Sequence, residues 1–86
     1  MEEQHFDGFR YGLAALLLRC PHLRPYAHIA HWWTEDIEEY GDAVRFRDRL
    51  RAEGDNKALL EEYEQICIEL EEEMQSYFGA SGHDLP

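Results

Sequence analysis

The chain has 86 residues, of which 19 are acidic and 8 are Lys or Arg, so its formal net charge is −11. This charge opposes direct binding to nucleic acid and to anionic lipid, and it attracts basic partners. A hydrophobic fraction of 44%, with 13% aromatic residues, excludes a disordered chain.

The length predicts a single domain over residues 1–86, with loose ends at 1–5 and 80–86. The first predicted helix covers residues 6–20, where apolar side chains recur at steps of three and four. It contains Gly8 and Gly12, which weaken its early turns and, if the helix runs through them, allow another helix to approach closely.

Pro21 ends this first helix, because the residue before a proline avoids the helical region. A turn over residues 21–25 follows, and residues 26–33 form a short helix. Thr34 is the expected N-cap of the next helical segment, with acidic residues in the first turn that favour the helix dipole.

Helical spacing continues from residue 35 to residue 53, but Gly41 and Asp42 lie in the middle of it. Either one helix runs through this range, or a turn at Gly41 lets Asp42 cap a second helix. We favour the break.

The last predicted helix is the longest, and it covers residues 55–78. Gly54 is expected as the residue that ends the preceding helix, and Asp55 as the cap of this one. One face carries Leu60, Tyr63, Cys67, Leu70, Met74 and Tyr77. The opposite faces carry Glu61, Glu62, Glu64, Glu69, Glu71, Glu72 and Glu73. The predicted fold class is therefore all-α, a small bundle of three to five helices with a long C-terminal amphipathic helix.

Cys20 and Cys67 both occupy apolar positions of helical patterns. We expect them to be buried and reduced rather than joined in a disulfide. No secretory signal is visible, and the apolar run at residues 13–18 is too short to span a bilayer. These features predict a cytoplasmic location without membrane association.

Catalytic motifs are missing from the sequence. The hydroxyl side chains at Thr34, Ser76 and Ser81 lie in no nucleophile motif, and no glycine-rich phosphate loop is present. The many carboxylates crowd helix surfaces, where they are solvated rather than tuned for acid–base chemistry. We expect a protein that is not an enzyme and has no cofactor.

A histidine cluster offers one alternative, a metal-binding helical module. His22, His28 and His31 lie close together in sequence, with Glu35 four residues beyond His31, and these residue types bind zinc or iron. However, a helix restarting at Thr34 misaligns Glu35, and no H-E-x-x-H motif is present. We therefore predict no metal site, with His28 and His31 as half-buried residues at the edge of the core.

Trp32 and Trp33 are adjacent, so on a helix they point about 100° apart. One is expected in the core and the other partly exposed, although both packing inside is the alternative. An exposed tryptophan among acidic residues is typical of a binding surface, because Trp and Tyr dominate interface hot spots. The predicted partner-binding residues are Trp32, Trp33, Glu35, Asp36, Glu38, Glu39 and Tyr40.

Four arginines at positions 45, 47, 49 and 51 form the only basic run. They could contact phosphate, but acidic segments flank them on both sides. We expect them to pair internally with the glutamates of the last helix, or with Asp42 and Asp48.

Residues 26–70 resemble the small immunity proteins of bacterial contact-dependent growth inhibition systems. The resemblance rests on His31-Trp32-Trp33 followed by Glu35-Asp36, on Asp42-Ala43-Val44 with Phe46, and on Leu59-Leu60-Glu61-Glu62. The chain lacks the compact aromatic–His–Asp–Trp run expected of that family. The resemblance implies a cytoplasmic protein that neutralises a toxin domain by binding it, and it carries over no individual site residue.

The leading functional hypothesis is a non-enzymatic binding protein that holds a basic protein partner such as a toxin or nuclease domain. A bacterial immunity protein and a phage-type inhibitor both fit, because a nuclease active site is basic in order to hold phosphate. Besides the metal-binding module, the remaining alternative is a subunit of a helical homo-oligomer, such as a homodimer, with the last helix as its seam.

Overall fold

The computed structural model describes residues 7–83, and this part of the chain is helical throughout apart from short connections. It contains the α-helices α1 (Gly8–Arg19), α2 (Thr34–Glu53) and α3 (Lys57–His83), with a 3-10 segment η1 (Pro21–Trp33) between the first two. The prediction of an all-α fold is confirmed, with three α-helices in the described residues.

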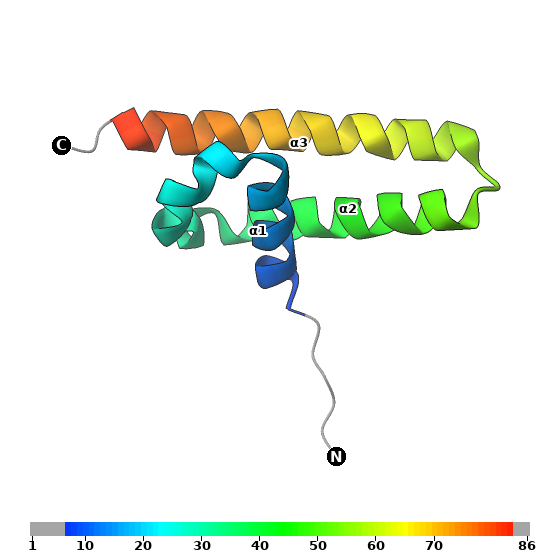
Figure 1. Ribbon diagram of the computed structural model, residues 1–86, viewed down its shortest axis with the longest axis horizontal. Helices are drawn as coiled ribbons and strands as arrows, with labels where there is room; N and C mark the ends of the chain where they lie inside the picture. The colour runs from blue at the N-terminus through cyan, green and yellow to red at the C-terminus, as the bar shows by residue number, and fades with distance from the viewer. Residues whose placement is uncertain (1–6, 84–86) are drawn as a thin grey trace, which may run out of the picture.

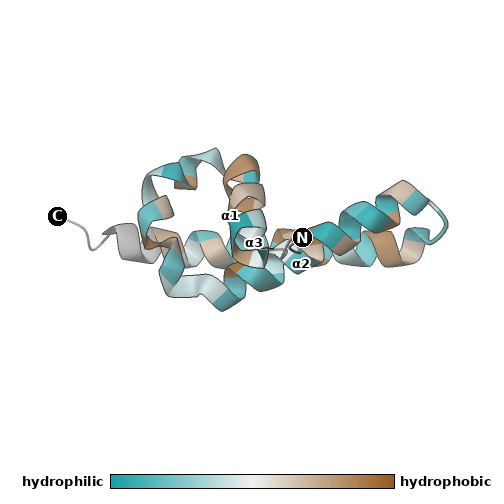
Figure 2. Cartoon of the chain, turned by 90° about the horizontal axis from the view of Figure 1, so that it is seen from below, coloured by the Kyte–Doolittle hydropathy of each residue, from teal (hydrophilic) through white to brown (hydrophobic). Residues whose placement is uncertain are grey.

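The helices α2 and α3 lie side by side and antiparallel, and α1 crosses α2 (Figure 1). The turn between α2 and α3 extends well beyond α1, so within residues 7–83 no third helix packs on the far end of this hairpin (Figure 1). The η1 segment bends away from α1 and back toward α2 in successive turns (Figure 2). Pro21 opens the segment, where its missing N–H removes no hydrogen bond, and Pro25 lies inside it, where proline disfavours a regular α-helix.

The crossing of α1 and α2 depends on two glycines. A Cβ added to Gly12 would lie 2.1 Å from the carbonyl oxygen of Ile37, and one added to Gly41 would lie 3.0 Å from the Cα of Gly12. The backbones therefore meet directly, and the prediction that Gly12 permits close approach is confirmed. The predicted break at Gly41 is wrong: α2 is continuous, and this glycine serves interhelical contact rather than a turn.

The helix ends agree only in part with those predicted from the sequence. Gly54 has a φ of 73° and donates its N–H to the carbonyl of Leu50 at 2.9 Å, as predicted. Thr34 is the first residue of α2 rather than its N-cap, and its Oγ1 donates to the carbonyl of His31. Asn56, not Asp55, caps α3, because its Oδ1 accepts the N–H of Leu59 at 3.1 Å.

The α3 helix is longer than predicted. It continues through Gly79 to His83, so residues 80–83 of the predicted loose end at 80–86 are helical. Residues 84–86 and the predicted loose end at 1–5 lie outside the described residues. Between residues 57 and 78, its buried side chains are Cys67, Met74 and Phe78, together with Glu71. The predicted apolar seam is therefore displaced: Leu60, Tyr63, Leu70 and Tyr77 are only half-buried.

Glu71 is the one predicted surface glutamate that the fold buries, with 6% of its surface exposed. Its Oε2 accepts a hydrogen bond from the Tyr40 hydroxyl at 2.7 Å and lies 3.2 Å from the Arg19 Nε. Burial and this hydrogen bond raise the pKa of Tyr40. One carboxylate thus connects α1, α2 and α3, and its two donors offset its removal from water.

Cys20 and Cys67 are buried and not joined to each other, as the sequence predicts. Gln75 Nε2 donates to the Cys20 Sγ at 3.4 Å. Burial raises the pKa of both thiols, which keeps them protonated and unreactive. Within residues 7–83, no helix combines the length and the apolar character that crossing a membrane requires.

Candidate partner-binding surface

The two tryptophans differ in exposure. The Trp33 ring stacks on that of Tyr77, with centroids 5.8 Å apart and planes at 11°, and it also contacts Phe78. Trp32 meets Trp33 edge-on and is 58% exposed. Trp33 is half-buried against the core and Trp32 is exposed, so the two differ as expected and the alternative in which both pack inside is wrong. Trp32 is therefore an apolar side chain available to a partner.

The predicted acidic residues lie at the start of α2. Glu35, Glu38 and Glu39 are exposed, and Asp36 is half-buried. Burial, followed by the nearby carboxylates of Glu73, Asp36 and Glu39, raises the pKa of Tyr77. The fold therefore gathers acids from α2 and α3 around the tyrosine on which Trp33 stacks.

Tyr40 does not belong to this surface, contrary to the prediction. Its side chain has no exposed area, and its hydroxyl is held by Glu71 inside the bundle. The direction of α2 explains the difference: Glu39 and Tyr40 are consecutive, so they point about 100° apart.

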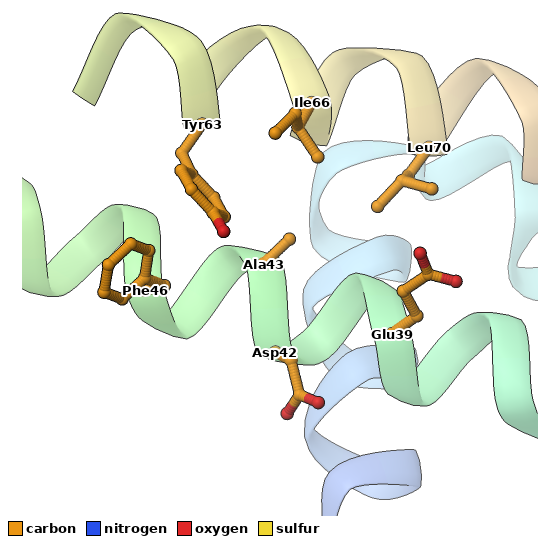
Figure 3. A pocket seen from close by; sticks show the side chains of 7 residues that line it. All are labelled: Glu39, Asp42, Ala43, Phe46, Tyr63, Ile66 and Leu70. Carbon is orange, nitrogen blue, oxygen red and sulfur yellow. The ribbon is translucent and has the colours of Figure 1, made fainter. Parts of the chain in front are cut away.

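A groove begins at Glu39, near the acidic start of α2, and follows the line where α2 meets α3. It has a volume of about 420 Å³ and is lined by Glu39, Asp42, Ala43, Phe46, Tyr63, Ile66 and Leu70. Figure 3 shows the Tyr63, Ile66 and Leu70 side chains reaching from α3 toward α2, with the Ala43 methyl between them and the Glu39 carboxylate near Leu70. The α1 helix passes behind α2 in this view, so it does not cover the groove (Figure 3).

A second hollow of about 430 Å³ adjoins the first along α3. The two share Ile66 and Leu70, and the second is otherwise lined by Glu69, Glu72 and Glu73. Apolar side chains therefore form the floor of the combined groove, while carboxylates border it on both helices. We call this feature the acidic groove, defined by the lining residues of the two hollows.

Sequence reasoning missed most of the acidic groove. The sequence pattern places Tyr63 and Leu70 on the apolar face of the last helix, and it indicates no surface role for Phe46 or Ile66. The usable signal is that Ile66 stands between Tyr63 and Leu70 at steps of three and four, which widens the apolar face of α3 beyond what one neighbouring helix covers.

The face of the α2–α3 pair that α1 covers carries arginines and exposed apolar side chains instead of a row of carboxylates. Leu18 and Ile68 are exposed there, near hollows lined by Arg19, Arg47 and Arg51. Arg19 is paired with Glu71, and within the basic run Arg47 and Arg51 are paired as predicted. Arg47 lies 2.9 Å from Asp48, and Arg51 lies 3.6 Å from Asp48 and 3.4 Å from Glu64.

His22, His28 and His31 are all exposed, so the predicted half-burial of His28 and His31 is wrong. Among residues 7–83, no group of three or more His, Cys, Asp or Glu side chains is placed to hold a metal ion. The His31 ring instead meets the Trp32 ring edge-on, with centroids 5.9 Å apart.

Comparison with protein-family models, with curated proteins and with solved structures found no match to this chain.

Proposed function

We propose that this protein is a non-enzymatic acidic binding protein that neutralises a basic protein partner, such as a toxin or nuclease domain. The observation that carries the proposal is the acidic groove: an apolar floor between α2 and α3 with carboxylates along both sides. Glu39 belongs both to this groove and to the acidic start of α2, and Trp32 is exposed in the segment just before α2.

The parts of this surface have separable roles. The net charge of −11 attracts a basic partner over long range and speeds the encounter. Trp32 and the groove floor offer apolar area that a bound partner removes from water, and such contacts determine how long a complex lasts. The resemblance to immunity proteins agrees with this division, and a phage-type inhibitor would use the same surface.

The experiment is a search for a basic partner followed by binding kinetics. The full chain is used as bait at low salt in lysate of its host, and each basic protein recovered is purified and tested at increasing salt. The double variant Glu38→Lys/Glu39→Lys is expected to slow association, because rim charges act on the encounter. Trp32→Ala is expected to speed dissociation, corresponding to about 2 kcal/mol if it is a hot spot.

The matched control is Glu61→Lys/Glu62→Lys, which makes the same charge change at exposed positions of α3 outside the acidic groove. It is expected to slow association much less. Recovery of no basic partner, or binding that ignores salt and both charge reversals, would refute the proposal and leave the acidity as a solubility device.

A further inference from the structure

We propose that the partner presents a basic amphipathic α-helix, which lies lengthwise in the acidic groove between α2 and α3. This inference rests on the proposed function, since it names the element that the same surface recognises.

The shape of the acidic groove favours a helix. Its α3 wall carries Tyr63, Ile66 and Leu70, which are two helical turns long, or about 10 Å. On the α2 wall, Glu39, Asp42, Ala43 and Phe46 cover the same length. Two antiparallel helices leave a furrow parallel to their axes, and a third helix packs into such a furrow by ridges-into-grooves contact.

The chemistry of the walls disfavours an extended peptide. The residues that line the acidic groove all belong to α2 and α3, whose backbone N–H and C=O groups are already used within the helices. An extended peptide would therefore find no backbone partners, whereas a helix satisfies its own backbone before it binds.

The floor provides a place for one apolar anchor. Ala43 is the smallest side chain in the first hollow, and it stands between larger ones on α3 (Figure 3). Phe46 and Tyr63 close the hollow at one end, with their rings edge-on and 4.7 Å apart. A leucine, isoleucine or phenylalanine of the partner helix fits above Ala43.

The borders require positive charge on either side of that anchor. Glu39 and Asp42 lie along α2, and Glu69 and Glu73 lie along α3 one turn apart. A helix with Lys or Arg on both flanks of an apolar stripe places one cation against each border.

The test uses a fluorescent 18-residue peptide with leucines at positions i, i+3, i+4 and i+7 and lysines on both flanks. Its comparison is a scrambled peptide of the same composition that lacks the apolar stripe. Anisotropy titrations with the full chain at low salt are expected to show at least tenfold tighter binding of the striped peptide.

Two variants alter the acidic groove. Ala43→Leu fills the hollow and Ile66→Lys places a cation in its floor, and each is expected to weaken binding of the striped peptide at least tenfold. Ala58→Leu is the matched control, because Ala58 is exposed on α3 outside the groove, and it is expected to leave the affinity unchanged. Thermal melts identify any variant that fails to fold, in which case the other variant decides.

The inference is overturned if both peptides bind equally, or if neither folded groove variant weakens binding. Its failure is distinguishable from failure of the proposed function. If Glu38→Lys/Glu39→Lys weakens binding of a basic partner but Ala43→Leu and Ile66→Lys do not, the proposed function is supported and the helix inference is refuted. Binding of the striped peptide in the groove, with no basic protein recovered from the host, would refute the function instead.

Discussion

Gly12→Ala tests the helix crossing on which this fold depends. A Cβ at position 12 would lie 2.1 Å from the oxygen and 3.0 Å from the carbon of the Ile37 carbonyl. Both atoms belong to the backbone of α2, so no side chain can rotate away. The helix α1 must therefore move as a unit, away from the neighbour that supplies most of its packing.

Two opposing effects determine the magnitude. Alanine is favoured over glycine inside a helix by about 1 kcal/mol, so propensity alone predicts that the variant is more stable. Overpacking of a well-packed interior costs about 1–3 kcal/mol, and a contact between backbones belongs at the upper end of that range. The expected net result is a free energy of unfolding lower by about 2 kcal/mol, or a melting temperature lower by roughly 8–16 °C for a domain of this size.

The assay is urea and thermal unfolding followed by far-ultraviolet circular dichroism. Ala14→Gly is the control, because Ala14 is exposed on the same helix and should show only the propensity cost of about 1 kcal/mol. Gly41→Ala should be less damaging than Gly12→Ala, since its closest contact is 3.0 Å. A Gly12→Ala variant as stable as the parent would refute the close crossing.

Three further predictions concern the core. Phe78→Ala should lower the free energy of unfolding by about 3–5 kcal/mol, whereas Ile68→Ala, at a side chain 40% exposed, should stay within about 0.5 kcal/mol; equal effects in urea titrations would show that the wrong face of α3 is inside. Tyr40→Phe removes a hydrogen bond to the Glu71 carboxylate and should cost about 1.5–3 kcal/mol. Folding raises the pKa of Tyr40 above its usual 10.0. The stability that its neutral phenol contributes is therefore fully present below about pH 10 and is lost as the pH rises through the raised pKa. If Tyr40→Phe loses as much stability at alkaline pH as the parent protein does, this assignment is contradicted. Thiol labelling of both cysteines should be slow in the native protein and fast in denaturant, and rapid native labelling would contradict their burial.

The candidate surface was predictable only where it depends on residues that are close together in the sequence. The exposure difference between Trp32 and Trp33 was expected from their adjacency on a helical segment, since consecutive side chains of a helix point about 100° apart. The acidic start of α2 was likewise visible in the sequence. The groove beside it was not visible in the sequence, because it exists only where the side chains of α2 and α3 meet.

Local periodicity by itself determined that the chain is helical, that an amphipathic helix follows Gly54, and that both cysteines are buried. These properties depend on residues three to seven apart, which a sequence displays directly. Only the tertiary structure decided that Gly41 continues a helix and that Glu71 lies inside the bundle. Both depend on neighbours distant in sequence: Gly41 on the approach of Gly12, and Glu71 on the two donors that offset its loss of water.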